Sequence, residues 1–149
     1  AVRVGAATIP PLPKTGALEG TAPHDAWFGA GWHTAERGGT QRFRWSQRSS
    51  SLLWRMDQPS QMRMVLRLRA ANAKGATIQA SINGNPLPAC ALAGGAWTDC
   101  RFEWPASANR AGINRLSLNA DSVSPSADRP GDPRELAFVM QASRVRAGS

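Results

Sequence analysis

Hydrophobic and polar residues alternate along much of the chain from residue 43 onward. In the clearest stretch, 62–69, the residues that share one side are all hydrophobic: Met62, Met64, Leu66 and Leu68. The other side carries Arg63, Val65, Arg67 and Arg69. Successive side chains of a β-strand point to opposite faces, so this pattern predicts a strand with one buried and one solvated face.

The same alternation recurs in shorter stretches that are separated by residues typical of turns. The hydrophobic members of these stretches are Phe43 and Trp45; Leu52, Trp54 and Met56; Ile78, Ala80 and Ile82; Cys100, Phe102 and Trp104; Leu116 and Leu118. We expect the four large aromatic residues Trp45, Trp54, Phe102 and Trp104 in the core. About eight short strands without long amphipathic helices between them predict an all-β domain, a two-sheet β-sandwich or jelly roll.

Two turns are predicted to be hairpins. Asn83–Gly84 follows the 78–82 stretch, and both residue types tolerate the positive φ of a tight hairpin. Gly94–Gly95 separates residues 86–93 from the stretch 97–104, and we expect these two stretches to pair as a second hairpin.

Cys90 and Cys100 are the two cysteines of the chain and are symmetric about Gly95. In a hairpin that turns at Gly95 they would face each other at roughly 4.5–5.5 Å, which a disulfide can span. Such a bond predicts an oxidising compartment, periplasmic or extracellular. The alternative is a pair of buried thiols in a reducing compartment.

The ends of the chain differ from its middle. Residues 1–23 are rich in proline and glycine, which predicts an arm or linker, followed by a sandwich domain over 24–146 and a tail over 147–149. Residues 121–134 predict a long loop. The stretch 134–142 contains helix formers, but its alternating hydrophobic residues favour a strand, and both interpretations stay open.

The net charge is +8, from 16 arginines and two lysines against ten acidic residues spread along the chain. Such a charge favours polyanions in general, including acidic glycans and anionic lipid head groups. No groove-binding helix or base-stacking motif accompanies it, so the sequence does not favour nucleic acid. An arginine-rich translation of a GC-rich genome explains the charge equally well.

No motif in the sequence names a reaction, a metal or a cofactor. A nucleophile elbow, a phosphate-binding glycine loop, a paired-histidine motif and a CxxC pair are absent. The cysteines and the distant His24 and His33 do not have zinc-ligand spacing. Glu36 is a candidate acid or base, but glycoside hydrolysis needs a second carboxylate, and an ion pair with Arg44 or Arg134 explains Glu36 better. We therefore expect a domain that is not an enzyme.

Aromatic and arginine residues are concentrated between residues 25 and 45. They include Trp27, Phe28, Trp32, His33, Arg42, Arg44 and Trp45. Indole faces stack on the apolar faces of sugar rings, and guanidinium groups donate hydrogen bonds to hydroxyls. Trp27 and Trp32 lie in irregular, glycine-rich sequence, so we predict that they contact a sugar together with His33; core packing is the alternative for both.

With these residues in view, the chain resembles the jelly-roll, carbohydrate-binding-like accessory domains of bacterial glycosyltransferases and surface-polysaccharide membrane proteins, which are similar to galactose-binding-like sandwiches. The stretches that carry the resemblance are Gly29–His33 with Glu36, Arg44–Trp45, Asn83–Gly84, Asn114–Leu116, Val123–Pro125 and Asp132–Leu136. It covers about residues 27–146 and omits the cysteines and the N-terminal arm.

The resemblance implies a module without catalytic activity that contacts or positions a bacterial surface glycan, neutral or acidic, beside a neighbouring domain or membrane protein. It also implies a polar cluster of Glu36, Arg44, Asp132 and Arg134, which either binds the ligand or ties the long loop down. A structural or protein-docking domain without a sugar site is the alternative function.

Overall fold

The computed structural model describes residues 15–19, 28–33, 36–38, 41–124, 131 and 134–147, with side chains from 28–33, 36, 37, 43–124, 131 and 134–141. One short 3-10 helix, Ala106–Ala108 (η3), lies among the strands. The strands are β1 (Thr15–Glu19), β2 (Glu36–Gly38), β3 (Gln41–Ser46), β4 (Ser49–Met56), β5 (Met62–Ala70), β6 (Ala76–Ile82), β7 (Asn85–Leu92), β8 (Thr98–Trp104), β9 (Gly112–Ala120) and β10 (Phe138–Ala147).

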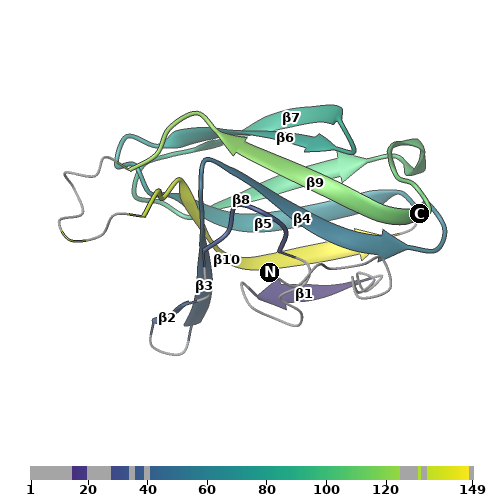
Figure 1. The fold of residues 1–149 in the computed structure, drawn as a ribbon, viewed down its shortest axis with the longest axis horizontal. Coiled ribbons are helices and arrows are strands. Elements are labelled where there is room, and N and C mark those ends of the chain that lie inside the picture. The colour runs from purple at the N-terminus through teal and green to yellow at the C-terminus, as the bar shows by residue number, and fades with distance from the viewer. Residues whose placement is uncertain are drawn as a thin grey trace.

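The strands form two antiparallel sheets that pack on each other (Figure 1). One sheet has the order β2-β3-β10-β5-β8, with β1 pairing along the C-terminal part of β10. The other sheet has the order β4-β9-β6-β7. The chain passes repeatedly from one sheet to the other, as in a jelly roll. The predicted two-sheet, all-β sandwich is therefore confirmed.

The core lies between the sheets and follows the period of two. In β5 the four residues predicted to face inward, Met62, Met64, Leu66 and Leu68, are each at most 2% exposed. Trp54 from β4 and Trp104 from β8 meet across the sandwich, with ring centroids 6.0 Å apart. Full burial of a large hydrophobic side chain contributes roughly 1.5–3 kcal/mol, so these positions dominate the stability of the fold.

The C-terminal stretch forms a strand, as favoured by its alternation. β10 lies between β3 and β5, and residues 136–140 are all buried. Strand β10 continues to Ala147, one residue beyond the expected end of the sandwich. Within the expected N-terminal arm, Thr15–Glu19 pairs with β10 as β1.

The first predicted hairpin is confirmed, and the second is wrong. Asn83 and Gly84 have φ values of 49° and 87° and join β6 to β7 in a two-residue turn. After Gly94–Gly95, however, the chain enters the other sheet, because β7 pairs with β6 whereas β8 pairs with β5. Two strands that face each other across the sandwich satisfy the same spacing as a hairpin, and the sequence pattern does not distinguish them.

The expected inward position of Trp45 is also wrong. In β3 the inward residues are Arg44 and Ser46, which are 8% and 0% exposed, whereas Phe43 and Trp45 are half-buried on the outer face. The guanidinium carbon of Arg44 lies 4.2 Å from the ring centroid of Phe28, which explains how an arginine is accommodated here. The phase of β3 therefore places two aromatic rings on the outside of the six-stranded sheet.

Candidate functional site

A surface hollow of about 380 Å³ opens on the outer face of the six-stranded sheet. We call it the aromatic hollow. Its lining consists of Phe43, Trp45, Arg69, Ala70, Ala71, Trp97 and Val139. Three aromatic rings and one guanidinium group thus share one concave surface.

The register of the sheet brings these side chains together. Val139 of β10 pairs with Trp45 of β3 on one side and with Arg69 of β5 on the other. Cross-strand partners point to the same face and have Cβ atoms about 4.5–5.5 Å apart. Val139 is only 4% exposed although it faces outward, so its neighbours cover it. The row from Trp45 to Arg69 is therefore a fixed feature of three hydrogen-bonded strands.

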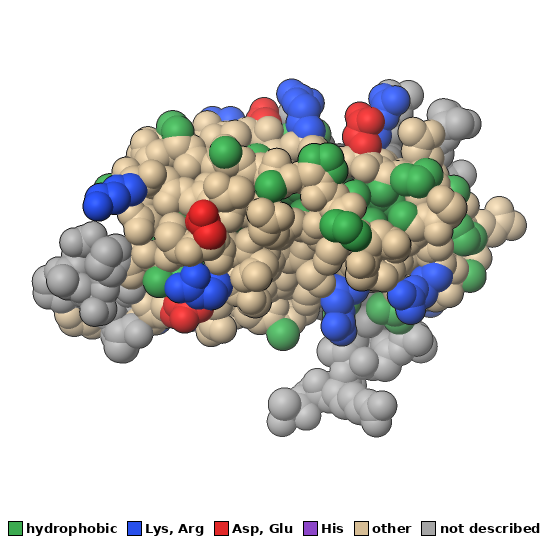
Figure 2. All heavy atoms as spheres, turned by 90° about the horizontal axis from the view of Figure 1, so that it is seen from above, with side chains coloured by type: hydrophobic (Ala, Val, Ile, Leu, Met, Phe, Trp, Pro, Cys, Tyr) green, Lys and Arg blue, Asp and Glu red, His purple; other side chains and the backbone are tan. Residues whose placement is uncertain are grey.

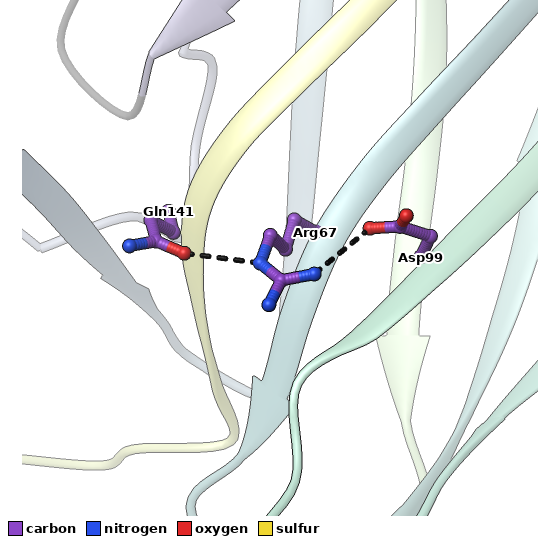
Figure 3. Close-up of polar contacts among 3 residues, drawn as sticks. All are labelled: Arg67, Asp99 and Gln141. Atoms are coloured by element: carbon purple, nitrogen blue, oxygen red, sulfur yellow. Dashed lines mark hydrogen bonds and ion pairs between the residues drawn. The ribbon is translucent and has the colours of Figure 1, made fainter.

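Arg67 lies beside the aromatic hollow and is held by two polar side chains (Figure 3). Its Nε donates to Oε1 of Gln141 at 3.1 Å, and its Nη1 lies 3.4 Å from Oδ1 of Asp99. Gln141 occupies a register shift in β10, and such bulges re-aim side chains. The Arg67 guanidinium carbon also lies 5.8 Å from the ring centroid of Trp97.

Arg69 differs from Arg67 in its partners. Asp99 offsets the charge of Arg67, while no described residue forms a hydrogen bond or ion pair with the side chain of Arg69. Arg69 is exposed at the hollow, so its five N–H donors are available to a ligand. The hollow consequently combines ring faces for stacking with a planar donor group for hydroxyl or carboxylate oxygens.

Trp32, predicted to contact a sugar, is a half-buried residue with several internal contacts. Its ring meets Phe28 and Phe138 edge to face, with centroids 5.2 and 5.7 Å apart. Its indole N–H donates to the backbone oxygen of Ser51 at 2.9 Å. These contacts give Trp32 a packing role between the 28–33 segment and the core.

His33, Glu36 and Arg134 meet at the start of the C-terminal segment. His33 Nε2 lies 2.7 Å from the backbone oxygen of Glu135, and Arg134 Nη1 lies 2.9 Å from Oε2 of Glu36. Glu135 Oε1 accepts a hydrogen bond from the backbone N–H of Arg48 at 2.7 Å. The expected ion pair of Glu36 with Arg134 is present, and together these contacts fasten residues 134–135 to the early strands.

Two predicted ligand residues, Trp27 and Asp132, lie outside the described residues. Arg44 is buried under Phe28, and its guanidinium therefore faces away from the aromatic hollow on the other side of β3. Of the other predicted ligand residues, His33, Glu36 and Arg134 lie in one region, whereas Arg44 and Trp32 pack toward the core.

The sequence reasoning missed the residues of the aromatic hollow. Trp97 and Arg69 of the lining and the neighbouring Arg67 and Gln141 come from two strands, β5 and β10, and from the turn before β8, and only the register unites them. A usable signal was the outward row of arginines in β5, together with a tryptophan directly before β8. Phe43 and Trp45, which also line the hollow, were missed because their alternation was interpreted as that of core residues.

The described residues show neither a metal-binding cluster nor a membrane-spanning helix. Among them, no three His, Cys, Asp or Glu side chains gather so that they could share a metal ion. They also contain no helix that is long and apolar enough to cross a membrane.

No protein-family model matches the sequence, and no curated protein matches it either. Solved structures do resemble it in fold, which is that of the jelly-roll carbohydrate-binding modules.

Among the individual structures, a family 35 carbohydrate-binding module from an environmental isolate has a TM-score of 0.57 at 13% identity, over 87% of this chain and 90% of that one. The family 35 module from Cellvibrio japonicus Abf62 has a TM-score of 0.55 at 15% identity, over 89% and 98% of the two chains. The Podospora anserina GH26-CBM35 β-(1,4)-mannanase has 0.56 at 9% identity, over 91% of this chain and 28% of that one. At these identities the likeness concerns the fold alone.

Proposed function

We propose that this domain is a non-catalytic glycan-binding module and that the aromatic hollow is its sugar-contact surface. The observation that carries the proposal is the convergence of Phe43, Trp45 and Trp97 on one hollow, which also contains the guanidinium of Arg69, a group that no described residue pairs. The jelly-roll fold supports it, because the solved structures of similar fold are named as carbohydrate-binding modules.

The chemistry of the hollow suits a saccharide. Sugar rings present an apolar C–H face that packs on an indole, and equatorial hydroxyls at the ring edge accept hydrogen bonds from a guanidinium. Because the hollow is open and no side chain among the described residues closes over it, we expect a dissociation constant near the millimolar end, or about 4 kcal/mol of binding free energy. A weak single site of this kind positions a polymer without trapping it.

The aromatic hollow is a better sugar site than the segment around Trp32. Trp32 already donates its N–H to the backbone oxygen of Ser51, and its ring packs edge to face with two phenylalanines. A ring that packs against neighbouring side chains has little exposed surface for a ligand. Trp45 and Trp97 have no such hydrogen-bonded anchor among the described residues.

We further propose that the domain works outside the cytoplasm, in the periplasm or extracellular space. The disulfide between Cys90 and Cys100 supports this, since disulfides persist in oxidising compartments. The partner of the domain would be a glycosyltransferase or membrane protein of bacterial surface-polysaccharide synthesis, as the sequence resemblance implies. The mannanase named above gives a parallel for the arrangement, because a domain of this fold makes up part of a longer chain.

A titration tests the proposed site. Neutral and acidic oligosaccharides from bacterial surface polysaccharides are added to the wild type and to Trp45→Ala and Trp97→Ala, and binding is followed by calorimetry. Loss of a ring platform should weaken binding about tenfold, which corresponds to ~1.4 kcal/mol. Gln79→Ala, an exposed residue on the four-stranded sheet, is the matched control.

Two outcomes would count against the sugar site. Absence of binding by the wild type at tens of millimolar saccharide would favour a docking domain without a sugar site. Equal binding by the wild type and both tryptophan variants would remove the aromatic hollow from the proposal.

A further inference from the structure

A second surface hollow, of about 480 Å³, lies on the outer face of the four-stranded sheet. It is bounded by β6, β9 and the turn between β6 and β7. Its lining includes Ser81, Asn83, Arg110, Ile113, Arg115 and Ser117. We call it the basic hollow, because its two charged lining residues are arginines.

Neither arginine is neutralised within the described part of the chain. Arg110 and Arg115 are both exposed, and no described residue forms a hydrogen bond or ion pair with either guanidinium group. The carboxylate of Asp57 follows β4, near the paired strand ends Met56 and Gly112. It makes no ion pair with either arginine. Ten N–H donors on two planar groups are therefore available at this hollow.

The main chain below these arginines is held by two asparagine side chains. Asn83 Oδ1 accepts from the backbone N–H of Arg115 at 2.9 Å, and Asn114 Oδ1 accepts from the backbone N–H of Arg110 at 2.9 Å. The two amides are joined directly, since Asn83 Nδ2 donates to Asn114 Oδ1 at 2.8 Å. Asn114 is fully buried, so one linked pair of amides fixes the positions from which both guanidinium groups extend.

The floor of the basic hollow adds hydroxyl donors. Ser81 of β6 and Ser117 of β9 are directly paired in the register and lie on the outward face, opposite to the buried Ile82 and Leu116. No described residue takes a hydrogen bond from either hydroxyl group. The hollow therefore combines two guanidinium groups with two hydroxyl groups over a rigid strand pair.

A third arginine flanks the basic hollow on the neighbouring strand. Arg55 of β4 pairs with Ile113 of β9, so it is a diagonal neighbour of Arg115 on the same face. Its Nε is buried and has no hydrogen-bond partner. A buried donor without an acceptor is unfavourable, and an anion beside it would supply the acceptor.

The net charge of the chain also favours anions. Seen from the side on which β6 and β7 lie, basic side chains project along several edges of the molecule with fewer acidic ones among them, and hydrophobic ones gather toward one end (Figure 2). The whole chain carries a net charge of +8. An anionic ligand that approaches this side meets a positive potential.

We propose that the basic hollow is a second ligand site, which binds the anionic group of a saccharide: the carboxylate of a uronic acid or a sulfate ester. Arg110 and Arg115 bind the oxygens of the anion by charge-assisted hydrogen bonds, and Ser81 and Ser117 bind adjoining hydroxyls. The identification of the ligand as a saccharide rests on the proposed function, while its anionic character rests on the two guanidinium groups that no described residue pairs. Two sites on opposite sheets would let one domain contact two chains, or two segments of one chain, with increased avidity.

Site-resolved NMR tests this proposal on the wild-type protein, since the two hollows report through different backbone amides. Three tetrasaccharides serve as probes: a uronic-acid oligomer, a sulfated oligomer and an uncharged oligomer of the same length. We expect shifts of the amides in 81–84 and 113–117 with at least one charged oligomer and none there with the uncharged one. The two charged probes distinguish carboxylate from sulfate.

Arg115→Gln should weaken binding of the charged oligomer about tenfold, as measured from the shifts of these amides, because one charged hydrogen-bond donor group is lost. Its fold should persist, because Asn83 contacts the backbone of Arg115 and not its side chain. Arg37→Gln on β2 removes the same charge from an exposed position elsewhere and should change the affinity less than about twofold.

The proposal is overturned if neither charged oligomer moves the amides of the basic hollow, or if Arg37→Gln weakens binding as much as Arg115→Gln does. The second result would mean attraction by net charge alone. The same spectra record whether the uncharged oligomer shifts the amides near Trp45. Those shifts test the proposed function separately from the basic hollow.

Discussion

Cys90 and Cys100 join the two sheets of the sandwich. Cys90 belongs to β7, which pairs with β6 in the four-stranded sheet, and Cys100 belongs to β8, which pairs with β5 in the six-stranded sheet. Their sulfur atoms are bonded, and their Cα atoms are 5.8 Å apart. The bond therefore fastens the two layers where the chain crosses from one to the other.

Replacing both cysteines by alanine should lower the free energy of unfolding by about 2–3 kcal/mol, because the unfolded chain regains the entropy of a loop of ten residues. Urea denaturation of the variant and the wild type measures this difference. Addition of reductant to the unfolding buffer should lower the free energy of unfolding of the wild type to that of the variant. The free energy of unfolding of the variant should not change. Equal midpoints for the two proteins without reductant would show that the bond does not stabilise the fold.

The sandwich could be predicted from the sequence because its strongest signals are local. The alternation in β5 and the Asn83–Gly84 turn depend on neighbours within a few residues. The disulfide was also predictable from spacing, but the placement of β7 and β8 in different sheets was not. Whether two strands lie side by side or face each other across a core is decided by the other strands that compete for their edges.

The candidate sites could not be predicted, because the residues that form them are distant in sequence. Val139 unites Trp45 and Arg69 only through the register of three strands. In β3, moreover, the larger and more hydrophobic residues face outward and Arg44 faces inward. Hydrophobic alternation predicts the period of such a strand correctly and its phase wrongly, because it assumes that the aromatic side is the buried one.

Trp32→Ala should chiefly destabilise the protein. The substitution removes two aromatic contacts and leaves the backbone oxygen of Ser51 without its indole donor, so we expect a loss of about 2–3 kcal/mol for this half-buried residue. Thermal unfolding measures the loss, and saccharide titration below the midpoint checks binding. A folded Trp32→Ala protein whose sugar affinity falls as far as that of Trp45→Ala would place a sugar contact at Trp32 after all.

Asn114→Ala should be among the most damaging polar substitutions in the domain. Asn114 is fully buried and bonds to Asn83, to the backbone of Arg110 and to the oxygen of Gly112. Each buried group left without a partner costs about 1–3 kcal/mol, so we expect a loss of at least about 2 kcal/mol in denaturant unfolding.

Asn119→Ala is the matched control for Asn114→Ala. Asn119 lies on the same strand, is exposed and accepts one hydrogen bond from Ser49, so its replacement should change stability by less than about 0.5 kcal/mol. Similar losses for the two variants would mean that the buried amide pair does not hold the β6–β7 turn.

Asp99→Asn should make the aromatic hollow more favourable for acidic saccharides. The carboxylate lies 3.4 Å from Arg67, and its removal leaves the charges of Arg67 and Arg69 uncompensated beside the hollow. We expect a roughly two- to fivefold gain in affinity for a uronic-acid oligomer in low salt, which declines as salt shortens the screening length to about 8 Å, and no change for an uncharged oligomer.

Glu103→Gln is the charge-matched control, because Glu103 forms the equivalent cross-strand pair with Arg63 farther along β8. Since both pairs are exposed, neither variant should lose more than about 1 kcal/mol of stability. An equal gain for both variants would assign the effect to net charge, and no gain for Asp99→Asn would mean that the charge beside Trp97 does not reach the bound sugar.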